Sequence, residues 1–177
     1  MRITSAALRP QDVVVALAVH DLGDTPWTYA SLGERLGLPD SHAHAAVQRG
    51  VRSHLIEGAS RRTRTRNLLE FLEHGVRYAF PVEPGPITRG IPTAASAPPL
   101  SKLLQRDSAG DLVWPHVEGT TTGQSVIPLY ATVPTIAPGL PSLHALLALV
   151  DALRLGSVRE RKLAVRELRR RLEPRSD

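Results

Sequence analysis

The sequence contains no cysteine, and this absence excludes disulfides, thiolate zinc sites, iron–sulfur clusters and a cysteine nucleophile. Aromatic residues make up only 4% of the chain, so an RNA-stacking platform or a carbohydrate-binding face would have few rings to use. No apolar run is long enough to span a bilayer, and the start of the chain lacks the basic end and apolar run of a signal peptide. We therefore expect a cytoplasmic protein without a membrane anchor.

What the chain does contain is typical of a globular domain. Its 177 residues, 42% hydrophobic and 22% charged, suit one compact domain and argue against wholesale disorder. The basic side chains are nearly all arginine and gather in two blocks. Residues 41–66 hold six arginines and one glutamate, and residues 155–177 carry a net charge of +4. Two local basic blocks on an otherwise slightly acidic chain favour a surface that binds a polyanion.

The first third of the chain predicts three short helices. An amphipathic helix is expected over residues 10–20, before a turn at Gly23. Thr28 is expected to cap a second helix, which ends at Gly37. A third helix is expected over residues 40–53, where apolar residues recur at i, i+3 and i+4. Three short helices with a tight turn between the second and third outline a helix-turn-helix unit.

The segment from Ser31 to Ile56 resembles, without a gap, the winged helix-turn-helix of bacterial regulators of the MarR and GntR kind. The likeness rests on small residues where two helices approach or the chain turns, and on apolar residues that fill the core. These residues are Leu32, Gly33, Leu36, Gly37, Ala43, Ala46, Val47 and Leu55. Pro39 departs from the pattern where a capping Ser or Thr is usual, Gly50 where a large core residue is usual, and His54 where a glycine is usual. Because glycine destabilises a helix by ~1 kcal/mol, we expect either a shorter third helix or another element packed against Gly50.

The resemblance implies that helix 40–53 enters the major groove of double-stranded DNA. Gln48 has the amide geometry to pair with adenine, and Arg49 has the fork that pairs with guanine. The residues expected to face base edges are Ser41, His42, His44, Ala45, Gln48 and Arg49. Those expected at the phosphates are Arg52, Arg61, Arg62, Arg64 and Arg66. Because one module buries little surface, we expect a homodimer on a pseudo-palindromic site.

The rest of the first module, residues 1–80, holds a loop and two short elements. Residues 57–66 occupy the place of a wing or basic loop. A short helix is expected over residues 68–74, and residues 76–80 alternate well enough to predict a strand.

Residues 81–141 form a proline-rich segment with 11 of the 15 prolines, which excludes a long helix or a central strand. Apolar residues are frequent enough to pack, with short runs at residues 112–114 and 125–130. We therefore expect short edge strands and extended chain wrapped over the helices.

The last segment, residues 142–177, predicts a helix hairpin. Ser142 is expected to cap the first helix, Gly156 to break it, and Ser157 with Glu160 to form the capping box of the second. The second helix carries an apolar seam among arginines, suited to a hairpin or a dimer contact: Val158, Val165, Leu168 and Leu172.

An ion pair is expected at the bend of this hairpin. Asp151 lies in an otherwise apolar helix with Arg154 three residues later, and Arg159 could fold back across the bend. Such a cluster is more typical of a structural lock than of a catalytic carboxylate. Together the three segments predict a mainly α fold with short β elements, of the α+β class.

Catalytic and metal-binding patterns are weak. His42 and His44 are two residues apart, so on a helix they point to different sides and cannot chelate one ion. Asp111, His116 and Ser125 are the hydrolase candidates, and the second glycine of a nucleophile elbow is missing after the serine. We expect neither an enzyme nor a metal or organic cofactor.

The hypothesis from the sequence is a sequence-specific DNA-binding transcriptional regulator, acting as a repressor. Two alternatives stay open at this point. The chain could be the antitoxin or another protein-interaction component of a bacterial two-gene module, with a protein partner bound through residues 81–177. It could also be a small-molecule-responsive regulator in which Trp114, Tyr130 and Tyr78 line a pocket.

Overall fold

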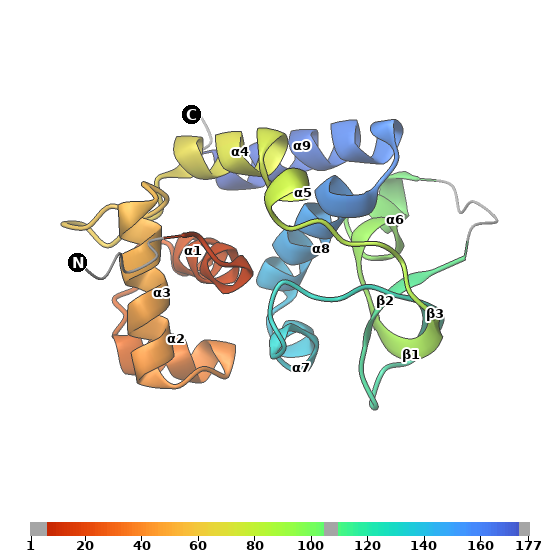
Figure 1. Cartoon of the computed structure of the whole chain (residues 1–177), viewed down its shortest axis with the longest axis horizontal. Helices are drawn as coiled ribbons and strands as arrows, with labels where there is room; N and C mark the ends of the chain where they lie inside the picture. The colour runs from red at the N-terminus through yellow and green to blue at the C-terminus, as the bar shows by residue number, and fades with distance from the viewer. Residues whose placement is uncertain (1–6, 105–109, 174–177) are drawn as a thin grey trace.

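The computed structural model describes residues 7–104 and 110–173. Within them the chain forms nine α-helices and three short strands (Figure 1). The helices are α1 (Pro10–Leu22), α2 (Tyr29–Leu36), α3 (Asp40–Arg52), α4 (Thr65–His74), α5 (Val76–Ala79), α6 (Leu100–Leu103), α7 (Val133–Ile136), α8 (Pro141–Leu155) and α9 (Val158–Leu172). The strands are β1 (Ile87–Pro92), β2 (Leu112–Pro115) and β3 (Thr121–Ser125). The mainly helical α+β class predicted from the sequence is confirmed.

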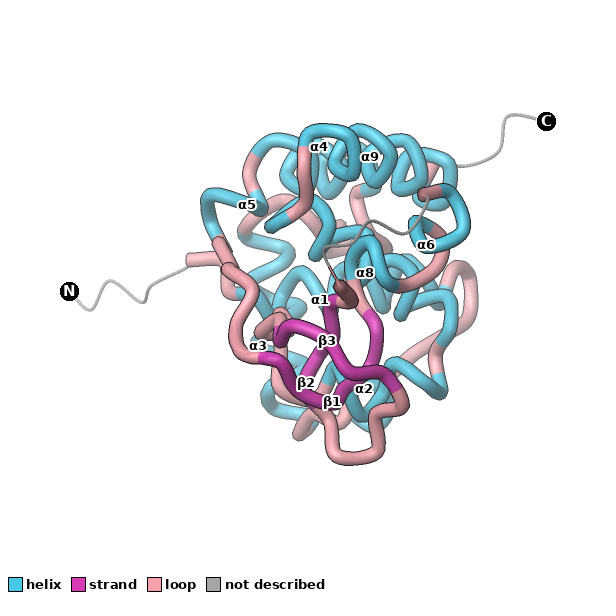
Figure 2. The backbone as a smooth tube through the Cα atoms, turned by 90° about the vertical axis from the view of Figure 1, so that its right-hand side faces the viewer, coloured by secondary structure: helices cyan, strands magenta, loops and turns pink. Residues whose placement is uncertain are grey.

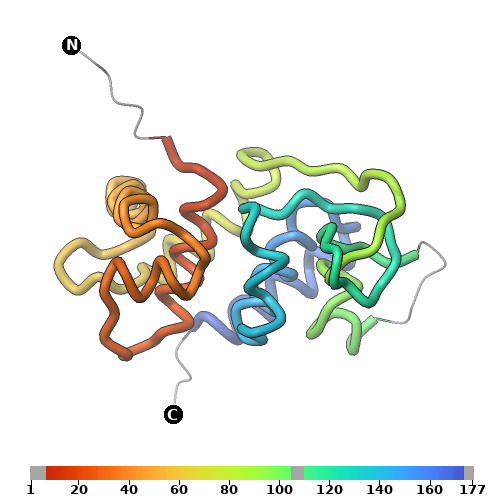
Figure 3. The backbone as a smooth tube through the Cα atoms, turned by 90° about the horizontal axis from the view of Figure 1, so that it is seen from below, coloured from red at the N-terminus to blue at the C-terminus, as the bar shows by residue number. Residues whose placement is uncertain are grey.

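Helix α1 is the central element of the fold. It packs against α2 and α3 on one side and α8 on the other, as Figures 1 and 3 show. Every residue from Asp12 to Val19 is buried, as is typical of a helix that is apolar around its whole circumference. The prediction of an amphipathic helix is therefore wrong, because neighbouring helices enclose α1 on both sides. The helix ends before Gly23 as predicted.

The turn between α2 and α3 follows the prediction. Ser31 N donates a hydrogen bond to Thr28 Oγ1 at 3.0 Å, so Thr28 caps α2. Gly37 ends α2 with a φ of 65°, in the left-handed region where glycine has no steric penalty. Helix α3 begins at Asp40 and packs on both α1 and α2.

The three departures from the helix-turn-helix pattern each have a local explanation. The carbonyl of Pro39 accepts the first backbone bond of α3, from His42 N at 2.9 Å, without a side-chain cap. A Cβ atom at Gly50 would lie 2.9 Å from Ile56 Cδ1, so the following segment packs where a side chain would otherwise stand. His54 itself adopts a φ of 58°, the left-handed conformation that a glycine usually supplies.

The loop after α3 is closed by a single antiparallel bridge between Ile56 and Thr63. In the part of the chain that the structure describes, no second pair of bridged residues extends this loop into a two-stranded wing. The helix expected over residues 68–74 is present as α4, which starts three residues earlier.

The predicted strand at residues 76–80 is wrong, because Val76–Ala79 forms the one-turn helix α5. Phe80 N donates to Val76 O at 2.9 Å. A pattern of five residues with Val76 buried and Tyr78 exposed fits one helical turn as well as a short strand. As a helical turn the segment packs against α8. A strand at this position would need another strand to pair with.

The proline-rich segment folds around a small barrel of three strands, drawn in magenta in Figure 2. β1 runs antiparallel to both β2 and β3, and β2 runs parallel to β3. Ile91 lies opposite Trp114 in this register. Pro92 and Pro115 stand at strand ends, where residues that lack an N–H donor are tolerated best. The short strands expected in this segment are therefore present. The expectation that they would be edge strands is wrong, because the barrel is closed and each strand pairs with both others.

The C-terminal hairpin consists of α8 and α9, which pack on each other. Ser157 N donates to Glu160 Oε2 at 2.5 Å and Glu160 N donates to Ser157 Oγ at 3.3 Å, which confirms the predicted capping box. Ser142 does not cap α8, because the helix already begins at Pro141. Leu168 and Leu172 are buried, since α9 also packs on α4. These two residues of the apolar seam therefore pack inside the chain and are not available for a dimer contact.

One hydrophobic cluster joins all three sequence segments. It includes the apolar residues of α1, Trp114 from β2, and Leu147 and Leu168 from the hairpin. None of the described helices combines the length and the apolar character that crossing a bilayer requires.

Candidate nucleic-acid interface

Helix α3 presents a polar face to solvent. Its apolar residues face α1 and α2, so the opposite side carries side chains with hydrogen-bonding or charged ends. Exposed or half-buried along α3 are Ser41, His42, His44, Ala45, Gln48 and Arg52. Five of the six residues predicted to face base edges are therefore accessible.

Arg49 is the exception, and the prediction that it points outward is wrong. The residue is 9% exposed and its guanidinium forms a bidentate ion pair with Asp12 on α1. Arg49 Nε donates to Asp12 Oδ2 at 2.9 Å, and Nη2 donates to Oδ1 at 2.7 Å. Asp12 is fully buried and also accepts a bond from Arg9 N at 2.8 Å. The Arg49 guanidinium thus joins α3 to α1 and is not free to pair with guanine.

An aromatic cluster supports the first turns of α3. The ring of Tyr29 meets the His44 imidazole edge to face, with centroids 4.7 Å apart and planes at 75°. Trp27 lies beside Tyr29 in a similar arrangement at 5.8 Å. These contacts restrain the imidazole of His44. The sequence patterns had assigned no role to Trp27 or Tyr29.

The segment of residues 57–64, called the basic loop from here on, places two arginines at the surface. Arg62 Nη2 lies 2.5 Å from Asp24 Oδ1, and the Arg62 side chain is 64% exposed. Arg64 pairs with Glu57, again at the surface. Exposed pairs of this kind contribute about 0–1 kcal/mol, so a phosphate can replace either carboxylate at little cost.

Arg61 differs from its neighbours in the basic loop. Its guanidinium carbon lies 3.8 Å from the ring centroid of Trp27 and 4.8 Å from that of Tyr29. Nε and Nη2 are buried and have no hydrogen-bond partner among the described residues. The sequence pattern grouped Arg61 with the phosphate contacts, whereas the guanidinium is held on two aromatic rings.

Arg52 and Arg66 complete the basic surface. Both are exposed, at the end of α3 and near the start of α4, and neither forms an ion pair with any residue in the described ranges. Figures 1 and 3 both show the basic loop beside α3. Accessible hydrogen-bonding side chains and exposed arginines therefore occur on neighbouring parts of the molecule.

A second polar cluster is buried between α8 and the barrel. Asp151 Oδ1 accepts from Arg154 Nη1 at 2.7 Å, which confirms the predicted ion pair. Asp151 Oδ2 accepts from Trp114 Nε1 at 2.6 Å and from Thr93 Oγ1 at 2.8 Å. Neither of these two donors was expected from the sequence. Arg159, which was expected to fold back toward the pair, is instead exposed.

Arg154 extends this cluster to two further segments. Nε donates to the carbonyl of Phe80 at 2.8 Å, and Nη1 donates to that of Ile127 at 3.1 Å. Burial raises the pKa of the Asp151 carboxyl above its ordinary value, and the neighbouring Arg154 opposes that rise. The cluster therefore ties the proline-rich segment to α8, as a structural lock would.

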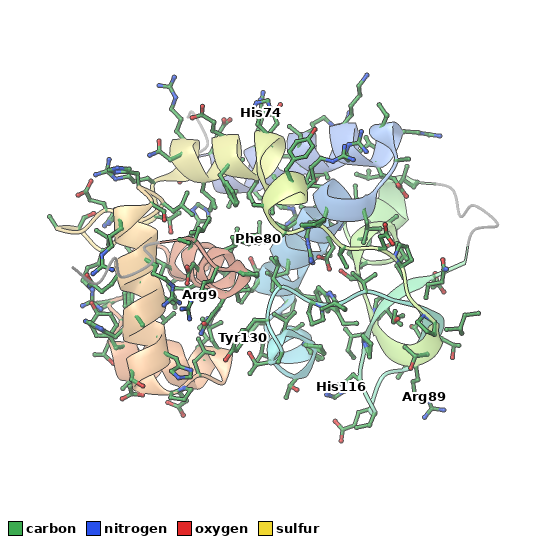
Figure 4. The ribbon with its side chains drawn as sticks, in the orientation of Figure 1. Arg9, His74, Phe80, Arg89, His116 and Tyr130 are labelled. Carbon is green, nitrogen blue, oxygen red and sulfur yellow. The ribbon has the colours of Figure 1, made fainter. Side chains whose placement is uncertain are left out.

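The hydrolase candidates do not come together. His116 Nδ1 accepts from Glu118 N at 3.3 Å, and Nε2 lies 3.4 Å from Thr135 Oγ1. Figure 4 shows His116 near Arg89 at one end of the barrel, away from α3. Among the described residues, no side-chain hydrogen bond joins Ser125 to His116 or to Asp111. Within the same ranges no three His, Asp or Glu side chains are grouped to hold a metal ion.

The aromatic residues proposed to line a ligand pocket differ in their exposure to solvent. Trp114 is buried and donates a hydrogen bond to Asp151, whereas Tyr78 is 75% exposed. An open groove of about 470 Å³ instead lies between the end of α3 and α4, and its lining residues are Leu8, Ser53, Leu55, Asn67, Glu70, Phe71, His74 and Gly75.

Comparison with models of protein families, with curated proteins and with solved structures finds no match to this chain.

Proposed function

We propose that the chain is a cytoplasmic, sequence-specific DNA-binding regulator that inserts α3 into the major groove. The observation that carries this proposal is the accessible polar face of α3 beside a loop rich in arginine. An α-helix fits the width of the major groove, and helix-turn-helix proteins read bases with the early residues of their second helix.

Base reading falls to the accessible side chains of α3. The amide of Gln48 can donate to and accept from adenine at once. His42 and His44 carry ring nitrogens that can bond to base edges, and the contact with Tyr29 holds the His44 ring in place. Arg49 is removed from this set because its guanidinium is buried on Asp12.

Phosphate binding falls to Arg52, Arg62, Arg64 and Arg66. Each contact releases condensed counterions, so the slope of log affinity against log salt changes by about −0.9 per phosphate neutralised. A homodimer would make eight such contacts and would have a slope of about −7.

The dimer follows from the area that a single module can bury. One helix in the groove reads only a few base pairs, and two-fold proteins gain specificity by reading two half-sites about one helical turn apart. Light scattering should therefore give a dimer on a two-half-site duplex. A single copy bound to that duplex at saturation would contradict this part of the proposal.

Selection from a random pool of DNA duplexes tests the proposal and identifies the target sequence in the same experiment. We expect the recovered sequences to share a pseudo-palindrome with half-sites about 10 base pairs apart. Recovery of a pool with no common sequence would contradict sequence-specific binding.

Replacing Gln48 by alanine should weaken binding to the selected duplex by about 1–3 kcal/mol per base pair read. Binding to a scrambled duplex should stay nearly unchanged, because the lost amide contacts no phosphate. Gln124→Ala, a change in β3, is the matched control and should alter neither affinity. Equal weakening on both duplexes by Gln48→Ala would show that α3 does not read bases.

A further inference from the structure

Arg61 is the one arginine of the basic loop whose guanidinium lies over aromatic rings. The 3.8 Å and 4.8 Å distances to Trp27 and Tyr29 are within the range of cation–π contacts. The same Tyr29 touches His44 on α3. A continuous series of contacts therefore runs from the basic loop, through the start of α2, to the polar face of α3.

The backbone of the basic loop has an unusual conformation at Arg61. Arg61 has a φ of 57°, a left-handed conformation that a residue with a Cβ adopts only when its surroundings impose it. The tip closes on itself, since Arg61 N donates to Glu57 O at 2.9 Å and Glu57 N donates to Arg62 O at 2.7 Å. Three side chains of the loop reach residues outside it: Arg61 lies on Trp27 and Tyr29, Arg62 pairs with Asp24, and Thr63 Oγ1 donates to the carbonyl of Ala16 on α1 at 2.7 Å.

We propose that Arg61 is a positioning residue, which anchors the tip of the basic loop on Trp27 and Tyr29 so that Arg62 stands beside α3. This inference rests on the proposed function, and it assigns Arg61 a role different from that of its neighbours. Arg61 stays on the rings when DNA is bound, because its Nε and Nη2 atoms are already removed from solvent. The phosphates are contacted by the two arginines whose side chains are exposed.

The decisive variant removes the ring and leaves every charge in place. In Trp27→Leu the tip of the loop loses its ring contact and no longer holds Arg62 beside α3, so two phosphate contacts are lost from a dimer. Arg64 stays in place, because Thr63 Oγ1 donates to Ala16 O and Arg64 N donates to Leu55 O. We expect the salt slope, measured by fluorescence anisotropy on a labelled two-half-site duplex, to change from about −7 to about −5. Because this substitution changes no charge, a change in the salt slope would mean that the positions of the charged side chains have changed.

Two further variants calibrate this result. Arg61→Lys keeps the charge but lacks the planar group that stacks on aromatic faces, so its slope should follow that of Trp27→Leu. Tyr78→Leu removes the ring beneath Arg77, a cation–π pair with a distance of 5.4 Å outside the basic loop, and should leave the slope at the wild-type value. Circular dichroism of each variant shows whether the fold is intact, and Arg61→Lys decides the question if Trp27→Leu does not fold.

Limited trypsin digestion provides a readout that does not depend on DNA. Trypsin cuts after arginine, and an anchored loop opens rarely. We expect cleavage at residues 61–66 to be about tenfold faster in Trp27→Leu than in the wild type, in proportion to the stabilisation that the ring contacts provide. Tyr78→Leu should be cut at the wild-type rate.

The outcomes separate the inference from the proposed function. Unchanged cleavage together with an unchanged salt slope would overturn the anchor. Tighter binding with a steeper slope in Trp27→Leu would also overturn it, because Arg61 would then be a phosphate contact that the rings hold back. A wild-type chain that binds neither duplex, with faster cleavage in Trp27→Leu, would retain the anchor and refute DNA binding.

Discussion

Asp151→Ala should lower the free energy of unfolding by about 3–5 kcal/mol, because it breaks a buried ion pair and leaves the partner charge without its counterion. The total stability of a domain is about 5–15 kcal/mol, so this single change removes a large share. Equilibrium denaturation in urea, followed by circular dichroism, measures the difference.

The expected size of this loss follows from the partners of the carboxylate. Without it, the guanidinium of Arg154, a residue that is 8% exposed, retains only backbone carbonyls as acceptors. The buried indole N–H of Trp114 and the hydroxyl of Thr93 lose their acceptor as well. An unsatisfied buried polar group costs about 1–3 kcal/mol.

Two comparisons identify the cause of the loss. Asp151→Asn keeps one oxygen that can accept from Trp114 and Thr93, but it removes the charge and replaces the oxygen that faces Arg154 with an NH2 donor. Its loss should be smaller than that of alanine, which removes both acceptor oxygens. Glu118→Ala changes an exposed carboxylate near the same barrel and should stay within about 0.5 kcal/mol of the wild type. If Asp151→Ala were as mild as Glu118→Ala, the cluster would not tie the proline-rich segment to α8.

Arg49→Ala should destabilise the fold by a similar amount, about 3–5 kcal/mol. The substitution leaves the fully buried Asp12 carboxylate without the guanidinium that neutralises it. An arginine that read guanine would behave differently, since its loss would weaken DNA binding and leave stability unchanged. Urea denaturation in the absence of DNA distinguishes the two roles.

Arg52→Ala is the matched control, because Arg52 lies one turn later on α3 and is exposed. It should leave stability within about 0.5 kcal/mol and change the salt slope of DNA binding. The double variant Asp12→Asn/Arg49→Met removes both charges and should be more stable than Arg49→Ala alone, since no unpaired buried charge remains. A fully stable Arg49→Ala chain would contradict the ion pair described above.

The helices of the first third were predictable because their signals are local. Caps and turns are set by neighbouring residues, as at Thr28 and Gly37, and apolar spacing gives the buried side of α3 directly. The capping box at Ser157 is local in the same sense. The strand predicted at residues 76–80 was wrong because a five-residue alternation also fits one helical turn.

The partners of distant residues could not be predicted from local patterns. Arg49 lies 37 residues from Asp12, and the direction of an arginine on the flank of α3 depends on which helix packs there. One signal was present in the sequence: Asp12 is the only charged residue among the buried positions of α1, and a buried carboxylate needs a cationic or hydrogen-bonding partner. The contact of Arg61 with Trp27 likewise depends on the path of the basic loop, which brings Arg61 next to a residue far away in the sequence.

The central claim is tested most directly by fluorescence anisotropy of the wild-type chain at several salt concentrations. The two probes are the duplex recovered by selection and a scrambled duplex of the same length. At physiological salt we predict binding to the first that is at least about 1,000-fold tighter, and a slope of about −7 on the scrambled duplex. Equal affinity for the two duplexes, or no binding to either, would contradict the assignment of α3 as a helix that reads DNA.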